Sequence, residues 1–517
     1  MYPAPPTLTQ DIDKLRTLIQ SFHPVIAIET PEEERVSTIL QATAQEIGMT
    51  IMEWSVTTGL TRSTQPGSNR WQDPCSPQSQ TQHHSTAEED PEKLLLFLRD
   101  HTAKAIYLLK DFTKHLTNPT IIRRFRELTD QFSSSRSTII LTEQTIDLPP
   151  ELRQNTYFYD LRLPGPDELT HVAKDVVRSL RIQNKVTIDV QEEDIPKLVS
   201  ALSGMTLKQA RQVIAHAALE DNKLCLQDIS NILKRKAQII QKDSILEFFP
   251  VQDEALNLGG FNGLKQWLAR ASVGFTPQAR QINLPVPKGI LIVGIQGCGK
   301  SLAAKTIAKA WNMPLLKLDS GKIYNKYVGE SEQNFRRAIA LAESMAPAIL
   351  WIDEIEKSIG SGNSGEADGG LSQRLFGSLL TWMQEKSQSV FVIATANDIS
   401  RIPPELLRKG RFDEIFFVDL PDERERSQIL QIHLHRHKQV IQNFDLVELI
   451  TATDGFSGAE IEQAVITALY GALAQQVALT TPDLVKAIKA TIPLSQSRRA
   501  DVEHLRAIAK TSFVSVK

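Results

Sequence analysis

The sequence has little cysteine, no long apolar run and almost no excess charge of either sign. Its three cysteines, Cys75, Cys225 and Cys298, are scattered and odd in number, which argues against a disulfide framework or a structural zinc site and fits a reducing compartment. With a net charge of −3, the chain has no excess of basic residues of the kind that nucleic-acid binding needs. No apolar run approaches the roughly 18 residues of a membrane span. Hydrophobic residues still make up 41% of the chain, so a packed globular core is expected.

The length of 517 residues predicts two to four domains. Between residues 1 and 160, short apolar runs alternate with helical patterns; the runs lie at 25–28, 49–54, 105–109 and 138–141. This alternation predicts a parallel sheet with helices on both faces. Residues 165–240 show only helical periodicity. We interpret residues 61–90, rich in Ser, Thr, Gln, Pro and His, as a mobile loop, and the glycine-rich residues 360–370 as a second flexible stretch.

The same plan recurs in the second half of the chain. Strands are predicted from apolar runs at 289–293, 315–318, 348–352, 390–394 and 415–418, and helical patterns fill 423–510. We therefore expect four parts. They are an α/β domain over 1–164, a helical subdomain over 165–245, a large α/β domain over 246–420, and a helical lid with a C-terminal extension over 421–517.

Three short segments of the first half reappear in the second half in the same order. Residues 148–152 (Leu-Pro-Pro-Glu-Leu) match 402–406 (Ile-Pro-Pro-Glu-Leu), 158–161 (Phe-Tyr-Asp-Leu) match 417–420 (Phe-Val-Asp-Leu), and 203–207 match 454–458. Chance similarity of proline turns and helix caps is the simpler alternative. The kept order and approximate spacing favour an internal duplication.

A glycine-rich loop follows the strand predicted at 289–293 and opens a helical run at 302–311. Its residues are Gly294-Ile295-Gln296-Gly297-Cys298-Gly299-Lys300-Ser301. They fit the phosphate-binding pattern G-x-x-x-x-G-K-[ST] in the strand–loop–helix setting that the pattern requires. Glycines let backbone N–H groups turn toward phosphates, and the helix N-terminus adds positive potential. Lys300 would reach the β- and γ-phosphates, and Ser301 would hold Mg²⁺.

Polar side chains follow the next predicted strands. Asp353 and Glu354 end the strand at 348–352, at the sheet edge beside the phosphate loop. Asp353 would support Mg²⁺, directly or through water, and Glu354 would be the general base toward the attacking water. Asn397, after the strand at 390–394, either positions that water, touches the γ-phosphate or is a turn residue. Arg408 and Arg411 either form a solvated face or reach the γ-phosphate of a neighbouring subunit.

Together with Gly455-Phe456-Ser457-Gly458-Ala459-Glu460, these motifs resemble the signature of the AAA ATPases over about residues 255–500. The resemblance implies a three-layer αβα P-loop fold with a helical lid, ATP and Mg²⁺ as cofactors, and hydrolysis of ATP to ADP and phosphate. It implies Asn397 as a sensor of the nucleotide and the two arginines as fingers acting on a neighbour, hence a ring, usually a hexamer. It also implies nucleotide contacts beyond the loop, at Gly259, Leu302, His433, Gly458 and Ala459.

The segment Lys326-Tyr327-Val328-Gly329 lies between the phosphate loop and Asp353. It resembles the first pore loop of the AAA family, which grips an extended polypeptide on the axis of the ring. An aromatic ring gives apolar contact that tolerates many sequences, and the glycine lets the loop swing. The alternative is a loop tyrosine that packs locally. The pore-loop interpretation predicts a protein substrate.

The whole chain resembles a narrower family, the AAA ATPases of the "forty-six" hypothetical chloroplast reading frame of cyanobacteria and algal plastids. Residues 380–386, 403–417 and 493–495 carry this resemblance, together with a long N-terminal region that has no phosphate loop of its own. It implies the bacterial cytoplasm or the plastid stroma as the location.

The first half lacks the chemistry of the second. When the first strands of the two halves are aligned, Thr30 falls on Gly294, and Glu32, Glu33 and Glu34 fall in the phosphate loop, where they would repel a triphosphate. Val36 stands where Lys300 should, and Lys110-Asp111 replace Asp353-Glu354. We therefore expect a degenerate ATPase-like domain that serves substrate docking or ring assembly. The alternative is an unrelated α/β domain.

Three functions are consistent with these features. The first is a hexameric ATPase that remodels or threads a protein substrate through a central pore. The second is an ATP-gated scaffold, and the third is a nucleic-acid motor or loader, which the acidic balance disfavours. The chain has no H-E-x-x-H motif, so it is not a self-contained AAA protease.

Overall fold

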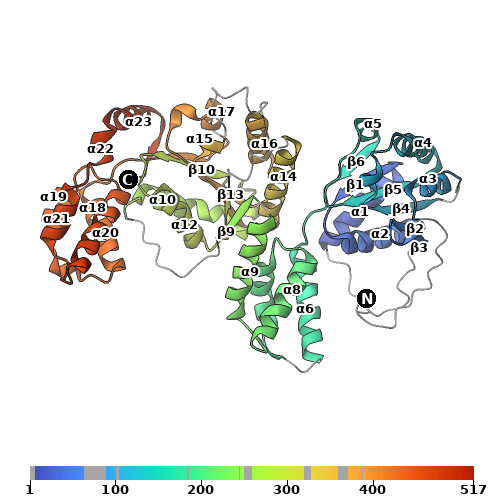
Figure 1. Ribbon diagram of the computed structural model, residues 1–517, viewed down its shortest axis with the longest axis horizontal. Coiled ribbons are helices and arrows are strands. Elements are labelled where there is room, and N and C mark those ends of the chain that lie inside the picture. The colour runs from blue at the N-terminus through green and yellow to red at the C-terminus, as the bar shows by residue number, and fades with distance from the viewer. Residues whose placement is uncertain are drawn as a thin grey trace. The chain divides into compact units, whose positions relative to one another are not determined.

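The computed structural model describes residues 6–62, 89–100, 104–182, 186–243, 245–249, 259–319, 328–358, 371–386, 388–408 and 410–516. The chain divides into two compact units, Met1–Ile229 and Ser230–Lys517, and the division falls within helix α9 (Asp228–Asp243). In each unit, helices cover both faces of a sheet, as Figure 1 shows. Of the loop predicted at 61–90, residues 63–88 lie outside the described residues, and residues 61 and 62 belong to strand β3. The second stretch, predicted at 360–370, lies wholly outside them.

Unit 1 contains a six-stranded sheet in the order β3-β2-β4-β5-β1-β6, parallel except for β3. The strands are β1 (Val25–Glu29), β2 (Thr50–Ser55), β3 (Gly59–Arg62), β4 (Ala105–Lys110), β5 (Thr138–Glu143) and β6 (Thr156–Tyr159). The helices are α1 (Pro6–Gln20), α2 (Glu33–Ile47), α3 (Pro91–Asp100), α4 (Pro119–Ser135) and α5 (Pro150–Arg153). The buried side chains of α1 and α2 share one face of the sheet, and those of α3 and α4 share the other. The predicted parallel sheet with two helical layers is therefore confirmed.

The remainder of unit 1 is mainly helical. It comprises α6 (Pro166–Ile182), α7 (Ile195–Leu202), α8 (Leu207–Glu220) and the start of α9. The prediction of helices alone over 165–240 was wrong in one respect, because β7 (Thr187–Asp189) and β8 (Lys223–Cys225) form a two-stranded parallel sheet. Strands of three residues are too short to produce a period-two pattern that a sequence can reveal.

Unit 2 contains a seven-stranded sheet in the order β15-β14-β10-β13-β12-β11-β9, parallel except for β9. The strands are β9 (Leu246–Phe249), β10 (Gly289–Gly294), β11 (Leu315–Leu318), β12 (Ala348–Ile352), β13 (Val390–Ala396), β14 (Glu414–Val418) and β15 (Val514–Ser515). The five strands predicted for this half are all present. The edge strands β9 and β15 were not predicted.

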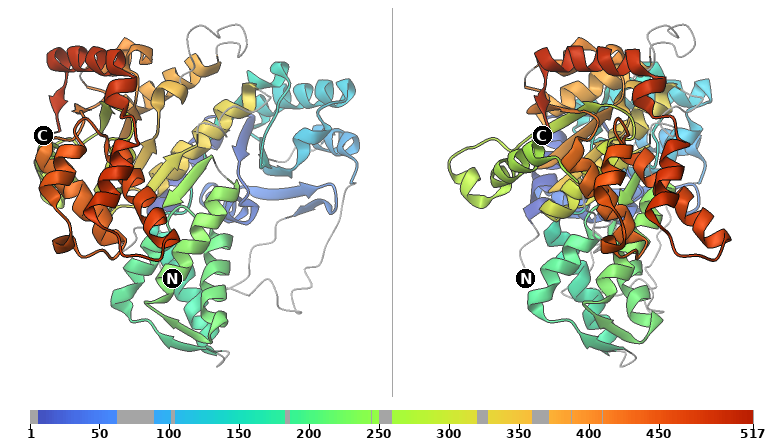
Figure 2. Two further views of the ribbon diagram at one scale, coloured as in Figure 1. Left: turned by 60° about the vertical axis from the view of Figure 1, so that its left-hand side comes forward. Right: turned by 90° about the vertical axis from the view of Figure 1, so that its left-hand side faces the viewer.

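Helices cover both faces of this sheet as well. Buried residues of α10 (Asn262–Ala271) and α12 (Lys300–Trp311) pack on one face, and those of α14 (Val328–Ser344) and α16 (Leu371–Glu385) pack on the other. Short helices α11 (Pro277–Gln281), α15 (Ile355–Ser358) and α17 (Pro404–Leu407) lie in the connections. A second, sheet-free core unites the lid helices α18 (Glu423–Arg436), α19 (Leu446–Ala452), α20 (Gly458–Ala474) and α21 (Thr481–Lys489). These helices and the final α22 (Leu494–Ser497) and α23 (Arg499–Ser512) are red in Figure 2.

The two large sheets share one strand order. Strands β1, β2, β4, β5 and β6 correspond to β10, β11, β12, β13 and β14, and each set runs second–third–fourth–first–fifth across its sheet. The three matched sequence segments also form the same structures. The Pro-Pro-Glu segments form the four-residue helices α5 and α17, the Asp-Leu segments follow β6 and β14, and Thr206 and Ser457 both close capping boxes, on α8 and α20. This agreement supports the internal duplication.

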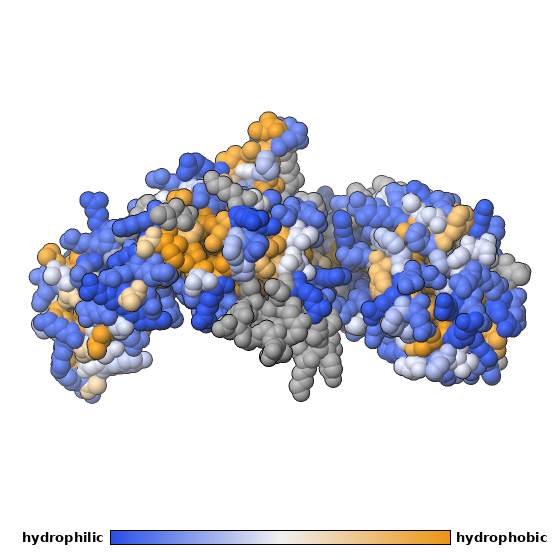
Figure 3. Space-filling view, turned by 90° about the horizontal axis from the view of Figure 1, so that it is seen from above, coloured by the Kyte–Doolittle hydropathy of each residue, from blue (hydrophilic) through white to orange (hydrophobic). Residues whose placement is uncertain are grey.

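None of the helices within the described ranges is both long and apolar enough to cross a membrane. The face shown in Figure 3 is mainly hydrophilic, with apolar side chains gathered in local patches.

Candidate nucleotide-binding site

The glycine-rich loop of unit 2 connects β10 to α12, as the sequence predicts. Gly297 and Gly299 adopt left-handed backbone conformations, with φ of 79° and 87°. A Cβ at Gly297 would lie 2.9 Å from Ser457 Oγ, so glycine is also required by space. The lid closes on this loop through a hydrogen bond in which the Ala459 N–H donates to the Gly297 carbonyl at 3.0 Å.

Lys300 is buried at the first position of α12. Its Nζ donates to the carbonyl oxygens of Gly294 and Ile295, both at 2.8 Å. Burial lowers the pKa of Lys300 to about 8, against the opposing effect of the nearby carboxylates. The contact of Ile295 with nucleotide stays a prediction, and it concerns the backbone, because the Ile295 side chain packs in the core beneath the loop. The Ile295 side chain is apolar, so only its backbone can face phosphate.

Asp353 is held by three donors from three elements. Its Oδ1 accepts from Thr395 Oγ1 at 2.6 Å and from Ser301 Oγ at 3.3 Å, and its Oδ2 accepts from Lys317 Nζ at 3.1 Å. A hydroxyl and a carboxylate are the hard oxygen ligands that Mg²⁺ prefers. Within the described ranges, no cluster of three or more His, Cys, Asp or Glu residues could hold a metal alone. The donor set therefore fits a Mg²⁺ ion, which Ser301 and Asp353 would hold and which would take its other ligands from phosphate and water.

Glu354 has a strained backbone with φ of 48°, which is uncommon for a residue other than glycine. Its N–H donates to Thr395 Oγ1 at 3.1 Å. The carboxylate accepts from Asn397 Nδ2 at 2.9 Å and pairs with Lys357 Nζ at 2.6 Å. The structure thus brings Asn397 to the predicted base, and Thr395 links that base to Asp353.

Glu356 is a buried acid that the sequence did not reveal. Its Oε1 accepts from the Asn397 N–H at 2.9 Å, so it fixes the backbone of the predicted sensor. Burial raises the pKa of this carboxyl. Lys317, Thr395 and Glu356 were all missed because each acts through strand register or a turn, which leaves no local motif.

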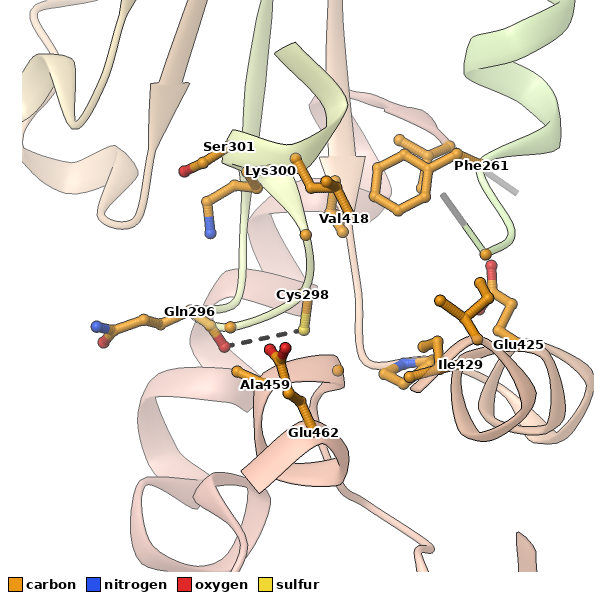
Figure 4. A pocket seen from close by; sticks show the side chains of 18 of the residues that line it. Phe261, Gln296, Cys298, Lys300, Ser301, Val418, Glu425, Ile429, Ala459 and Glu462 are labelled. Carbon is orange, nitrogen blue, oxygen red and sulfur yellow. Dashed lines mark hydrogen bonds between the residues drawn. The ribbon is translucent and has the colours of Figure 1, made fainter. Parts of the chain in front are cut away.

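A cavity of about 840 Å³ joins these groups to the lid. Figure 4 shows residues from the phosphate loop and lid lining it. Predicted residues in its wall are Gly259, Gln296, Gly297, Cys298, Gly299, Lys300, Ser301, Leu302, Asp353, Glu354, Asn397, His433, Gly458 and Ala459. Additional wall residues include Phe261, Val418 and Ile429, which give the cavity an apolar side suited to a flat base.

Besides Lys300, two wall residues have shifted pKa values. Burial raises the pKa of the Cys298 thiol to about 12, so it stays protonated and serves to fill space in the loop. Burial also lowers the pKa of His433, despite Glu462 at 3.5 Å from its Nδ1. The His433 side chain is therefore neutral at neutral pH.

The two predicted arginine fingers lie outside this wall. Arg408 is exposed after α17, and Arg411 Nη1 donates to the Glu405 carbonyl at 2.6 Å. Neither arginine side chain lines the cavity of its own chain. Of the predicted pore loop, Lys326 and Tyr327 lie outside the described residues, while Val328 and Gly329 begin α14.

The corresponding place in unit 1 is filled by side chains. Here the loop between β1 and α2 spans only residues 30–32, so the prediction that Glu33 and Glu34 lie in it was wrong; they form the first turn of α2. Glu32 accepts from the Leu207 N–H at 2.6 Å, and α8 begins at Leu207 as α20 begins beside Ala459. Burial raises the pKa of Glu32. Val36 packs in the core.

Arg35 holds this cluster together. Its side chain is 3% exposed and makes two hydrogen bonds to Glu168, at 2.9 and 3.0 Å. Asp11 and Glu32 each lie 3.6 Å from it. One buried cation thus serves three carboxylates where unit 2 has its phosphate loop, and no lysine equivalent to Lys300 is present.

The chain is similar to several known proteins. Three family models match the chain: the ATPase family associated with various cellular activities (AAA) over 290–420, and the N-terminal and second domains of the SpoVK-like AAA ATPases over 11–161 and 167–243. The chain is 36% identical over 505 residues to an uncharacterized AAA domain-containing protein ycf46 of Pyropia yezoensis, covering 97% of both chains. It is 36% identical to the ycf46 protein of Trieres chinensis with the same coverage. A proteasome-activating nucleotidase of Aeropyrum pernix is 35% identical over 41% of this chain and 52% of its own.

The Arg35 cluster predicts a large stability effect. Arg35→Met leaves Asp11, Glu32 and Glu168 buried without a cation, so the free energy of unfolding of unit 1 should fall by about 3–5 kcal/mol. Urea unfolding of the full chain measures it. Arg16→Met is the matched control, because Arg16 makes exposed pairs with Asp13 and Glu46 that are worth under about 1 kcal/mol. Equal losses in the two variants would contradict this interpretation.

Proposed function

The chain belongs to the ycf46 family of AAA domain-containing proteins, and we propose that it is a hexameric, ATP-hydrolysing motor that remodels or threads a protein substrate. The observation that carries this proposal is the convergence of the phosphate loop, Asp353, Glu354 and Asn397 on one cavity closed by the lid. Membership of the AAA family supports ATPase activity in general. The ring and the substrate are the further steps of the proposal.

Each group has a defined task in hydrolysis. The backbone N–H groups of the loop and Lys300, after its ammonium turns from the two carbonyls, would bind the phosphates. Ser301 and Asp353 would hold Mg²⁺, which when bound neutralises phosphate charge. Glu354 would take a proton from the attacking water, and Asn397, bonded to Glu354, would fix the direction of that carboxylate.

The arginines favour an oligomer. Arg408 and Arg411 do not line the cavity of their own chain, whereas a cation at the γ-phosphate lowers the barrier to phosphoryl transfer. We place them at the nucleotide of a neighbouring subunit, which makes the active site complete only in a ring. The similar protein of Aeropyrum pernix is named a proteasome-activating nucleotidase, and this name favours a protein substrate for the present chain.

An ATP-gated scaffold is the second candidate function, because the same cavity and lid would also report nucleotide binding. A nucleic-acid motor is the weaker third, since the net charge is −3. We place the protein in the bacterial cytoplasm or, for an algal member, in the plastid stroma.

Glu354→Gln should abolish ATP turnover while leaving ATP bound, because the amide cannot accept the proton of the attacking water. We expect a loss of at least about a hundredfold in phosphate release. Glu385→Gln, at an exposed position on α16, is the control and should turn over as wild type does. Turnover that persists in the Glu354→Gln protein would refute the assigned base.

Tyr327→Ala separates threading from scaffolding. The probe is a fluorescent protein with an unstructured tail, whose loss of fluorescence in the presence of ATP reports unfolding. We expect ATP turnover within about twofold of wild type but unfolding reduced by at least about tenfold, because the pore would lose its aromatic contact. Tyr157→Ala, an exposed tyrosine of unit 1, is the control. Undiminished unfolding, or none by the wild type, would count against threading.

A further inference from the structure

Lys317 on β11 pairs with Asp353, the carboxylate that we propose to hold Mg²⁺, at the end of the neighbouring strand β12. Lys317 lies opposite Trp351 in the parallel register of β11 and β12, and Asp353 lies two residues beyond Trp351 on the same face. The Lys317 ammonium is 3.1 Å from Asp353 Oδ2 and 4.5 Å from the centroid of the Trp351 ring. An aromatic face and a carboxylate together fix its position.

Both carboxylate oxygens of Asp353 have partners, and Lys317 is the partner of Oδ2. Thr395 and Ser301 donate to Oδ1, and Lys317 pairs with Oδ2. The Lys317 and Asp353 side chains are 29% and 23% exposed, so water screens their attraction only partly. A divalent cation that approaches Asp353 in the absence of nucleotide therefore meets a carboxylate whose charge is already balanced.

Unit 1 has the same ion pair with the charges reversed. Glu53 lies opposite Leu108 in the register of β2 and β4, and its carboxylate pairs at 3.0 Å with Lys110, two residues beyond Leu108. The fold thus accommodates an ion pair of either polarity at this place. In unit 2 the acid of the pair is Asp353, which follows β12 and lies next to Ser301. In unit 1 the acid is Glu53 on β2, and Lys110 stands at the end of β4.

We propose that Lys317 is a positioning residue that keeps Asp353 neutralised until nucleotide arrives, so that the divalent cation enters together with ATP. This inference rests on the proposed function of the same site. ATP would bring the phosphate charge that outweighs Lys317, and the ammonium would then remain over Trp351 while the ion takes its ligands. The order of binding follows from charge alone and requires no movement of the backbone.

Binding of Mn²⁺ to the nucleotide-free full chain tests the proposal, with electron paramagnetic resonance as the readout. The wild type should bind Mn²⁺ weakly, and Lys317→Met should bind it at least about tenfold more tightly, because one screened charge interaction is removed. Lys317→Gln should show the same gain. Adding Asp353→Ala should remove the gain. Lys305→Met is the matched control, since the Lys305 ammonium also lies over an aromatic ring, that of Phe249 at 5.0 Å, and should leave Mn²⁺ binding unchanged.

A charge-reversed protein, Lys317→Glu with Asp353→Lys, separates this role from a structural one. It copies the polarity of unit 1, so it should keep a melting temperature near that of wild type yet show no Mn²⁺ binding. Equal Mn²⁺ affinity of wild type, Lys317→Met and Lys317→Gln would overturn the proposal. The measurement needs no hydrolysis, so a chain that failed to turn over ATP would refute the proposed function without deciding this inference.

Discussion

The hydrogen bonds of the Thr395 hydroxyl join the two acidic groups of the site, and the rest of the geometry depends on them. Thr395 donates to Asp353 and accepts from the backbone of Glu354, which holds Glu354 in a left-handed conformation. This contact exists because β13 pairs with both β10 and β12, so the carboxyl ends of three parallel strands meet at one edge. The phosphate loop, Asp353 and Glu354 are then neighbours by topology.

The two units show how one strand order supports different chemistry. Asp111 in unit 1 has φ of 53° and follows β4 as Glu354 follows Asp353 after β12, so the turn itself is shared. What differs is charge: Arg35 and three carboxylates occupy the place of the phosphate loop, and Lys110 replaces Asp353. The helical segment starting at Leu207 is tied to the Glu32 side chain, whereas the Ala459 N–H of the lid of unit 2 donates to the Gly297 carbonyl of the loop. At this place unit 1 is thus filled by its own side chains, whereas unit 2 has a cavity between loop and lid.

Much of this could be read from the sequence, and the failures have physical causes. The strands and the loop 294–301 were predictable because buried strands are continuous apolar runs and the loop is one contiguous pattern. Lys317 and Thr395 were not, because their importance arises from inter-strand register. Glu33 and Glu34 were misplaced because an alignment by strand ends cannot show that α2 starts earlier than α12 does. The pore-loop tyrosine and the trans role of the arginines remain predictions.

The number of ATP molecules bound per chain tests most directly whether unit 2 holds the sole nucleotide site. Equilibrium dialysis of the Glu354→Gln protein with ATP and Mg²⁺ should give about one ATP per chain, since a protein that cannot hydrolyse ATP retains it. Adding Lys300→Ala should reduce that number toward zero. Two ATP molecules per chain, or one that survives Lys300→Ala, would contradict a closed unit 1 and a single site built on the phosphate loop.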